Sequence, residues 1–265
     1  DTIPRCGSIE PHLGIVSLPD NRLDHLGNIY KPKKIIPATV EFTDIAGLVR
    51  GASKGEGLGN QFLGQIRQTS AIIREERCFD NANVTHVDGS IDPIRDAETI
   101  ETELLLADLE TLEKRLRKTE KVARSGSKEA INELALIERL TGHCSSGKQA
   151  RTIPLLSGEK EILKSFHLLT TKPILYIANV DENEILESET QNQYVKKLTD
   201  YAKKENNHTI RICASIEQEI AVLPPDEKKL FLEEYNLSEP GLHKVIRSSF
   251  HLLGLHLPFF YNIKQ

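Results

Sequence analysis

The chain has 265 residues and a formal net charge of −5, with 38% hydrophobic and 28% charged residues. These values are typical of a globular protein and argue against nonspecific nucleic-acid binding over the whole surface. Four widely spaced cysteines without a C-x-x-C pair predict neither a zinc site nor a disulfide framework. No apolar stretch approaches the roughly 20 residues of a membrane span, so we expect a cytoplasmic protein without a membrane partner.

The first predicted elements are a strand over residues 13–19 and a helix over residues 21–30. An apolar run at 35–42 then predicts the central strand of a sheet, which ends near an acidic residue, Asp44. Ligands of open parallel α/β sheets gather beyond the carboxyl ends of the strands. Asp44 could therefore hold a metal-bound water, and the N–H group of Gly47 could approach a phosphate. An ordinary turn explains this D-x-x-G string equally well.

Glycines occupy alternate positions in the next segment, at Gly55, Gly57 and Gly59. Such a segment is easily reordered, which suits a switch that closes on a γ-phosphate and opens after hydrolysis, although a plain flexible loop has the same composition. The strings at 44–49 and 55–60 together resemble the second switch of the YchF-type Obg-like ATPases, which are translation-factor-related P-loop nucleotidases.

The resemblance implies an α/β fold of the P-loop NTPase type, with a mainly parallel sheet flanked by helices and an inserted antiparallel coiled-coil hairpin. Residues 1–96 and 158–265 would form the two parts of the nucleotide-binding domain, and residues 97–157 the hairpin. The chain starts without a methionine, and we expect it to be a fragment that lacks the family's P-loop and C-terminal TGS domain. Ser8 takes the place of the threonine that binds Mg²⁺ in the family's first switch.

A helix is predicted over residues 60–69, and a core strand should follow it. The apolar residues of that strand are interrupted by Arg-Glu-Glu-Arg at 74–77. A strand buried on both faces is nearly continuous in apolar residues, and charges there are costly without partners. We therefore expect a shortened or distorted strand. His86, which has no oriented partner in the sequence, is expected to be structural.

A long helix without glycine or proline is predicted from residue 97 to residue 124, with leucines at alternating spacings of four and three, as in a coiled coil. A Ser-Gly-Ser break and a second helix over 128–140 complete a helical hairpin. The hairpin would either project, where it could bind a protein partner, or pack as an ordinary helix pair. The following segment, 142–148, satisfies G-x-x-x-x-G-K, but Gln149 replaces the Ser/Thr and no strand precedes it, so we do not expect a P-loop.

A buried strand is predicted over residues 173–178, and Asn179-Val180-Asp181-Glu182 follows it. Guanine-specific relatives of the family carry N-K-x-D at this place, where the Asp carboxylate binds guanine. The change to Val180 and Glu182 implies a preference for ATP over GTP, with Asn179 bracing the loop and Val180 lying against adenine. A later strand at 209–213 leads to Ser215, in a loop that resembles the family's last nucleotide loop.

The resemblance thus implies an ATPase that uses Mg²⁺ and associates with ribosomes. Leu48 stands where many GTPases have a water-orienting glutamine, and we assign no catalytic residue. Without a P-loop this chain is expected to bind nucleotide weakly and to hydrolyse it poorly. Two alternatives remain open: a non-hydrolysing module that docks on the ribosome or on a protein through the hairpin, and a coiled-coil interaction scaffold.

Overall fold

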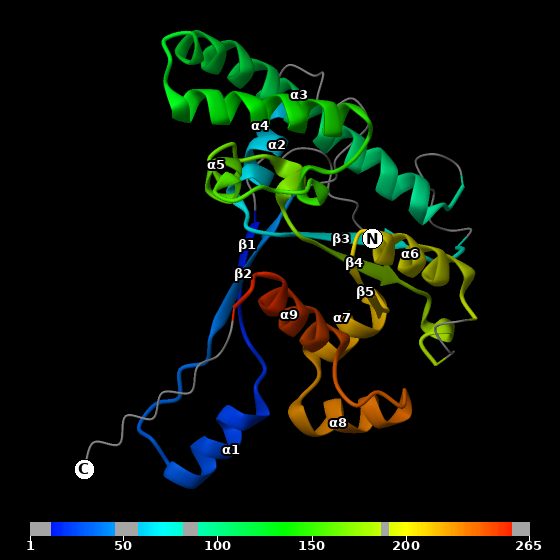
Figure 1. Cartoon of the computed structure of the whole chain (residues 1–265). Coiled ribbons are helices and arrows are strands. Elements are labelled where there is room, and N and C mark those ends of the chain that lie inside the picture. Colours follow the sequence, from blue (N-terminus) through cyan, green and yellow to red (C-terminus); the bar gives the residue numbers. More distant parts are fainter. Residues whose placement is uncertain (1–11, 46–57, 82–89, 187–190, 256–265) are drawn as a thin grey trace.

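The computed structural model describes residues 12–45, 58–81, 90–186 and 191–255. The strands in these ranges form two separate sheets (Figure 1). The smaller sheet pairs two antiparallel strands, β1 (His12–Ser17) and β2 (Thr39–Asp44). The larger sheet is parallel, with β4 (Ile174–Asn179) between β3 (Ile72–Arg77) and β5 (His208–Ile212).

The helices of the described ranges cover and connect these sheets. In chain order they are α1 (Asn21–Tyr30), α2 (Leu58–Gln68), α3 (Pro93–Ala123), α4 (Lys128–Ser145), α5 (Glu159–Lys164), α6 (Gln193–Lys204), α7 (Ala214–Val222), α8 (Pro225–Glu234) and α9 (Gly241–Leu252). Short 3₁₀ turns lie at η1 (Ala150–Thr152), η2 (Leu169–Thr171) and η3 (Glu182–Glu184). None of these helices combines the length and apolar character needed to cross a membrane.

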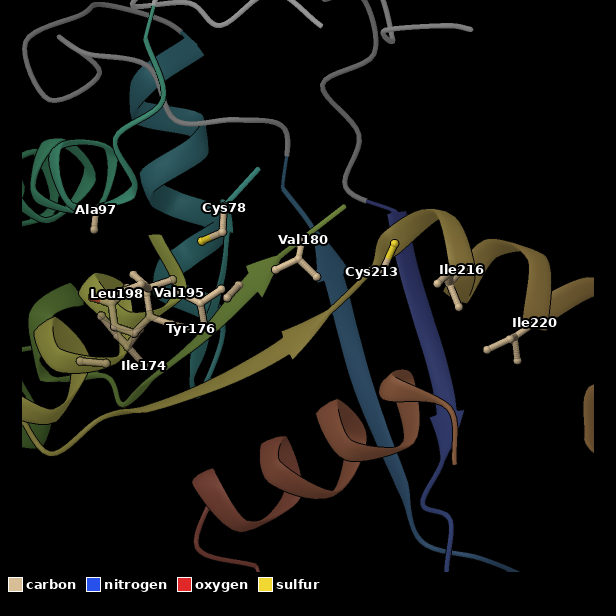
Figure 2. Packing of buried hydrophobic residues seen from close by; sticks show 12 residues of the cluster. Cys78, Ala97, Ile174, Tyr176, Val180, Val195, Leu198, Cys213, Ile216 and Ile220 are labelled. Atoms are coloured by element: carbon tan, nitrogen blue, oxygen red, sulfur yellow. The ribbon is translucent and has the colours of Figure 1, made fainter. Parts of the chain in front are cut away.

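The parallel sheet is built around β4, whose first five residues are all buried. The predicted crossover from this strand through a helix to the next parallel strand is confirmed by β4, α6 and β5. Figure 2 shows the cluster on this sheet, in which Tyr176 lies near Val195 and Leu198, residues of α6. Burial raises the pKa of the Cys78 thiol, a member of the same cluster, to about 12. The expected α/β architecture with a parallel sheet is therefore present.

The position of β2 corrects one expectation. The apolar run at 35–42 predicts the central strand of the parallel sheet, but β2 pairs with β1 outside that sheet and begins only at Thr39. Its residues alternate between polar and apolar, and Val40 is buried while Glu41 is exposed. Such alternation is typical of a strand with one covered face, as found in antiparallel sheets.

Helix α9 joins the two sheets, because it packs against β2 of the smaller sheet and against β4 and β5 of the larger one. Ile246 and Phe250 of this helix form a buried cluster with Leu18 and Val40. The opposite face of the smaller sheet leaves Leu13 exposed. In the described ranges, α9 therefore links the two sheets, and no strand of one sheet pairs with a strand of the other.

The expectation of a shortened β3 is wrong, since all six residues of β3 pair in register with β4, from Ile72 opposite Ile174 to Arg77 opposite Asn179. Arg74 and Glu76 point to the buried side of the strand and form an ion pair of 2.5 Å. These charges are accommodated because each finds a partner.

Further contacts hold the arginines of β3. The Arg74 guanidinium donates a hydrogen bond to the carbonyl of Ala97 at 2.8 Å and lies 5.6 Å from the ring centroid of Tyr176. Arg77 donates to the carbonyl of Phe79 at 3.1 Å and stacks on the ring of that residue. Carbonyl oxygens and aromatic faces thus replace the water that these side chains lose.

Helices α3 and α4 pack side by side as an antiparallel pair joined by the turn at residues 124–127 (Figure 1). Leu112 of α3 and Leu136, Ile137 and Leu140 of α4 are fully buried in the cluster between them. Arg115 of α3 contacts Glu133 of α4 at 2.7 Å. Phe166, from the segment after α5, completes the cluster near the middle of the pair.

The first turns of α3 belong to the sheet rather than to the helix pair. Glu101 is buried and accepts hydrogen bonds from the hydroxyl groups of Tyr176 and Tyr201, and from Gln149 at 3.1 Å. Burial and the nearby Glu101 carboxylate raise the pKa of both tyrosines. This network fixes the base of α3 to β4 and α6.

Candidate functional site

The carboxyl ends of β3, β4 and β5 meet at one edge of the parallel sheet, and Asn179 stands at the centre of this edge. Its Nδ2 atom donates to the Glu75 carboxylate at 2.7 Å, and its Oδ1 atom accepts from the N–H group of Ala214 at 3.0 Å. Glu75 belongs to β3 and Ala214 opens α7. The Asn179 side chain therefore links all three strand ends, which is the geometry expected of a loop brace.

The acidic turn after β4 leaves one carboxylate free. Asp181 caps η3 by accepting from the N–H group of Asn183 at 3.2 Å, and Glu184 accepts from the N–H group of Asp181 at 3.1 Å. Glu182 is exposed, and its carboxylate has no hydrogen-bond or ion-pair partner in the described parts of the chain. Of the three acids in this turn, only Glu182 is thus available to a ligand.

Val180 and Ser215 flank this turn in different environments. Val180 is 2% exposed and lies in the core cluster of the sheet, and its N–H group donates to the carbonyl of Ile212 at 2.9 Å (Figure 2). Its contact with a base stays a prediction. Ser215 is exposed in the first turn of α7, with its hydroxyl 3.1 Å from the sulfur of Cys213. Helix α7 begins without a side-chain cap.

Asp44 lies at the end of β2, in the other sheet, and the structure does not bring it into contact with Asn179, Glu182 or Ser215. Its carboxylate is exposed and has no partner among the described residues. The next residue, Ile45, packs against the cluster of α2 and α3 and so anchors the strand end. The two other predicted site residues, Ser8 and Gly47, lie outside the described ranges.

Mg²⁺ takes oxygen ligands and is commonly held by one or two carboxylates together with substrate phosphates. The free carboxylate of Asp44 fits such a partial site. Within residues 12–45, 58–81, 90–186 and 191–255, no group of three or more His, Cys, Asp or Glu side chains could hold a metal on its own.

The G-x-x-x-x-G-K string is not arranged as a P-loop. Residues 142–145 form the end of α4, and Gly147 makes a turn with a positive φ of 80°. Gln149 is buried and bound to Glu101. The prediction that no strand precedes this string is therefore confirmed.

Glu75 was not predicted as a member of the site, because the charged residues 74–77 were expected only to shorten or distort the strand. The alternation of side chains along a strand could have revealed it. Position 75 faces away from Arg74 and Glu76, which are buried, and it lies one strand from Asn179. An amide braced by Glu75, a free carboxylate at Glu182 and an exposed hydroxyl at Ser215 make an edge suited to binding hydrogen-bond donors.

No family model matches the chain, but comparison with individual known proteins finds relatives that carry the same name. The chain is 48% identical over 252 residues to the ribosome-binding ATPase YchF of Bacillus subtilis, covering 95% of this chain and 68% of the relative. It is 45% identical over 262 residues to the protein of the same name from Haemophilus influenzae, covering 99% and 71%.

A solved structure agrees with these relatives. The structure of the Schizosaccharomyces pombe YchF GTPase matches with a TM-score of 0.80 and 34% identity, covering 93% of this chain and 66% of that one. The chain thus spans about two thirds of the length of the proteins it matches. On the strength of this identity along nearly its whole length, the chain belongs to the YchF family.

Proposed function

We propose that this chain is a nucleotidase that binds and hydrolyses ATP with Mg²⁺ and associates with ribosomes in the cytoplasm. The relatives from Bacillus subtilis and Haemophilus influenzae, named ribosome-binding ATPases, support the proposal. The observation that carries it is the strand edge at which Asn179 links β3 to the start of α7 while Glu182 keeps a free carboxylate.

ATP is the preferred nucleotide in this proposal, although the fission-yeast relative is named a GTPase. An exposed carboxylate at Glu182 accepts a hydrogen bond from the exocyclic amine of adenine. Guanine offers two adjacent donors that suit the shorter side chain of aspartate. A site built for one hydrogen-bond pattern discriminates against another because its polar groups are then left unpaired. Ser215 and the buried Val180 border the space for the base.

Mg²⁺ would be held by Asp44 and Ser8 together with the phosphates of the nucleotide. The bound ion would neutralise charge that develops on the phosphates during transfer. Gly47 would offer its N–H group to the γ-phosphate. We expect weak binding and slow hydrolysis by the chain alone, because no P-loop is found in its sequence and most of the phosphate affinity comes from such a loop.

The test is equilibrium titration of fluorescent ATP and GTP, with Mg²⁺, into the chain, with the Bacillus subtilis relative as the positive control. We expect Asn179→Ala to weaken the binding of both nucleotides about equally, by roughly tenfold, because it removes the hydrogen bonds that link β3 and the start of α7. Glu182→Asp should reduce the preference for ATP. Glu138→Gln, which changes an exposed glutamate of α4, is the matched control and should change neither affinity.

Two results would contradict the proposal. If the relative binds nucleotide and this chain binds none at millimolar concentration, the chain is not a nucleotide-binding protein by itself. If Glu182→Asp leaves the ratio of the two affinities unchanged, Glu182 does not select the base.

A second candidate function is a non-hydrolysing module that docks on the ribosome or on a protein through residues 97–157, taken as a coiled-coil insertion between the domain parts at 1–96 and 158–265. The antiparallel packing of α3 and α4 favours it. Because the base of α3 is buried in the sheet, the test is removal of residues 117–131 with a short Gly-Ser turn in their place. Loss of ribosome binding with ATP binding intact would favour this second function for the helix pair.

A further inference from the structure

Strand β1 lies at the edge of the smaller sheet, where β2 pairs with one of its sides. Among the strands of the described ranges, none pairs with the other side of β1. An unpaired strand edge presents a row of main-chain N–H and C=O groups that can pair with a further strand. The outer edge of β1 is therefore open to strand pairing.

The main-chain groups at this open edge belong to alternate residues of β1. Leu18 donates its N–H group to the carbonyl of Ala38 at 2.7 Å, in continuation of the antiparallel register of β1 and β2. Hydrogen-bonded pairs recur at every second residue of an antiparallel ladder, so the N–H and C=O groups of Gly14 face β2. Those of Leu13 and Ile15 therefore face the open edge.

β1 lacks the features that usually prevent one strand edge from pairing with another. Proteins protect edge strands with charged side chains, with proline or with β-bulges. Residues 12–17 contain no proline and no Asp, Glu, Lys or Arg, and each of them pairs with β2 in an unbroken register. All of these residues except Val16 are exposed. The open edge is thus accessible and unprotected along the strand.

The side chains on the uncovered face of the smaller sheet favour a partner at the edge over a partner that packs on the face. Leu13 and Ile15 lie on the face opposite Val16, which packs toward α9, and they are 59% and 61% exposed. Their neighbours on β2 are Thr43 and Glu41. A layer packed on this face would bury the Glu41 carboxylate at a cost, whereas a strand at the edge covers mainly the aliphatic side chains.

The sequence around Gly14 suits pairing with a second copy of the same strand. Leu13 and Ile15 flank this glycine and are similar in size, so the strand is nearly symmetric about Gly14. With a two-fold axis at Gly14, Leu13 of each copy pairs with Ile15 of the other copy, and the main-chain groups of the open edges meet in hydrogen-bonded pairs. The aliphatic side chains then lie together on one face, and no like charges meet at the axis.

We propose that two copies of this chain associate through their β1 strands, which pair antiparallel and join the two smaller sheets into one continuous sheet. A two-stranded ribbon is only marginally stable by itself, and further strands stabilise it. One pair of short strands buries less than the roughly 1,200 Å² typical of stable complexes, so the dimer is expected to be weak. The association does not depend on nucleotide binding or on ribosome binding.

Sedimentation equilibrium of the whole chain, at protein concentrations from about 5 to 500 µM, is the test. We expect a monomer at the lowest concentrations and a rising fraction of dimer at the highest. Leu13→Lys/Ile15→Lys places charges along the edge and should weaken dimerisation about tenfold or more. The matched control, Thr39→Lys/Thr43→Lys, adds the same charge to the same face of β2 and should change the dissociation constant by no more than about twofold.

A second pair of variants tests the main-chain hydrogen bonds. Ile15→Pro removes an N–H group that faces the open edge, and proline is compatible with such a position because the ladder to β2 keeps its hydrogen bonds. Ile15→Ala shortens the same side chain but keeps the N–H group. We expect Ile15→Pro to dimerise about tenfold more weakly than Ile15→Ala. Circular dichroism and urea unfolding at low protein concentration check that both variants fold.

Amide hydrogen exchange locates the interface. Exchange at Leu13 and Ile15 should slow as the protein concentration rises, because these amides become hydrogen-bonded in the dimer. A dimer that persists in Leu13→Lys/Ile15→Lys would lie elsewhere on the molecule, and the proposal would be wrong. Equal weakening by this variant and by the control on β2 would indicate packing on the face and would also overturn it. A chain that stays monomeric at every concentration excludes a second copy as the partner of β1.

Discussion

Strands β1 and β3 are both six residues long, but apolar side chains of β1 are exposed whereas charged side chains of β3 are buried. β1 reads His-Leu-Gly-Ile-Val-Ser, yet Leu13 and Ile15 are 59% and 61% exposed. β3 contains Arg-Glu-Glu-Arg, yet Arg74 and Glu76 are 7% and 5% exposed.

The difference lies in the neighbours of each strand. Among the strands that the structure describes, β1 pairs only with β2, and their sheet is covered on one face by α9. β3 lies between β4 and the first turns of α3, which provide a carbonyl and an aromatic face for Arg74. Burial in this molecule thus follows the surrounding elements more closely than it follows the hydrophobicity of the strand itself. Four measurements test this conclusion.

The largest effect is expected from Glu76→Ala, which leaves the Arg74 guanidinium buried without its counter-ion. Breaking one side of a buried ion pair typically costs about 3–5 kcal/mol. Urea unfolding should therefore show a large loss of stability. Glu75→Ala on the same strand is the control, and it should cost less than about 1 kcal/mol because Glu75 is exposed. Equal losses for the two variants would contradict the burial difference.

The next effect is on the pH dependence of stability. Burial raises the pKa of Glu76 to about 7, although Arg74 acts in the opposite direction. Between about pH 4.5 and 7 the folded state keeps a proton that the unfolded state releases, so this contribution to stability falls as the pH rises. Relative to Glu76→Gln, the wild-type chain should lose roughly 1–3 kcal/mol between pH 5 and pH 8. A constant difference in urea unfolding at the two pH values would rule out this titration.

A smaller effect is expected when both charges are replaced together, as in Arg74→Met/Glu76→Leu. Apolar side chains of similar size avoid the desolvation penalty, so the double variant should be within about 1 kcal/mol of wild type or more stable. The measurement is the urea midpoint of the double variant beside Glu76→Ala. A double variant as unstable as the single one would show that the ion pair itself is required.

The smallest effect is expected in β1. Leu13→Ser/Ile15→Ser changes two exposed side chains and should alter the free energy of unfolding by no more than about 0.5 kcal/mol. The control is Val40→Ser, which lies in the covered face of the same sheet and should be clearly destabilising. A loss above about 1 kcal/mol for the β1 variant would mean that this face is covered in solution.

The sequence predicted the parallel core better than the strands around it. β4 is apolar on both faces, so its position was evident from composition, and the crossover to β5 followed. β2 was misplaced because its apolar run was given more weight than its alternation. Two of the partners of Arg74, Ala97 and Tyr176, lie 23 and about 100 residues away, and no local pattern reveals them.

The candidate site was likewise predicted from the sequence only in part. Asn179 was predicted from the resemblance of residues 179–182 to the N-K-x-D string of guanine-specific relatives, and its side chain contacts Glu75 and the N–H group of Ala214. The Glu182 carboxylate is unpaired because Asp181 and Glu184 form the capping hydrogen bonds of η3. Glu75 joins the site only through the register of β3 on β4. These are properties of paired elements, which a single stretch of sequence does not contain.

Helix α3 is continuous for 31 residues, so it is about 46 Å long. Its base is buried against the sheet through Ala97 and Glu101, and its far end carries the exposed side chains of Lys118 and Lys121. Because the base of the helix is held beside β4, a small rotation at the base is amplified at the far end. A tilt of about 5° at the base would move the far end by about 4 Å, which is comparable to the length of a hydrogen-bonded contact.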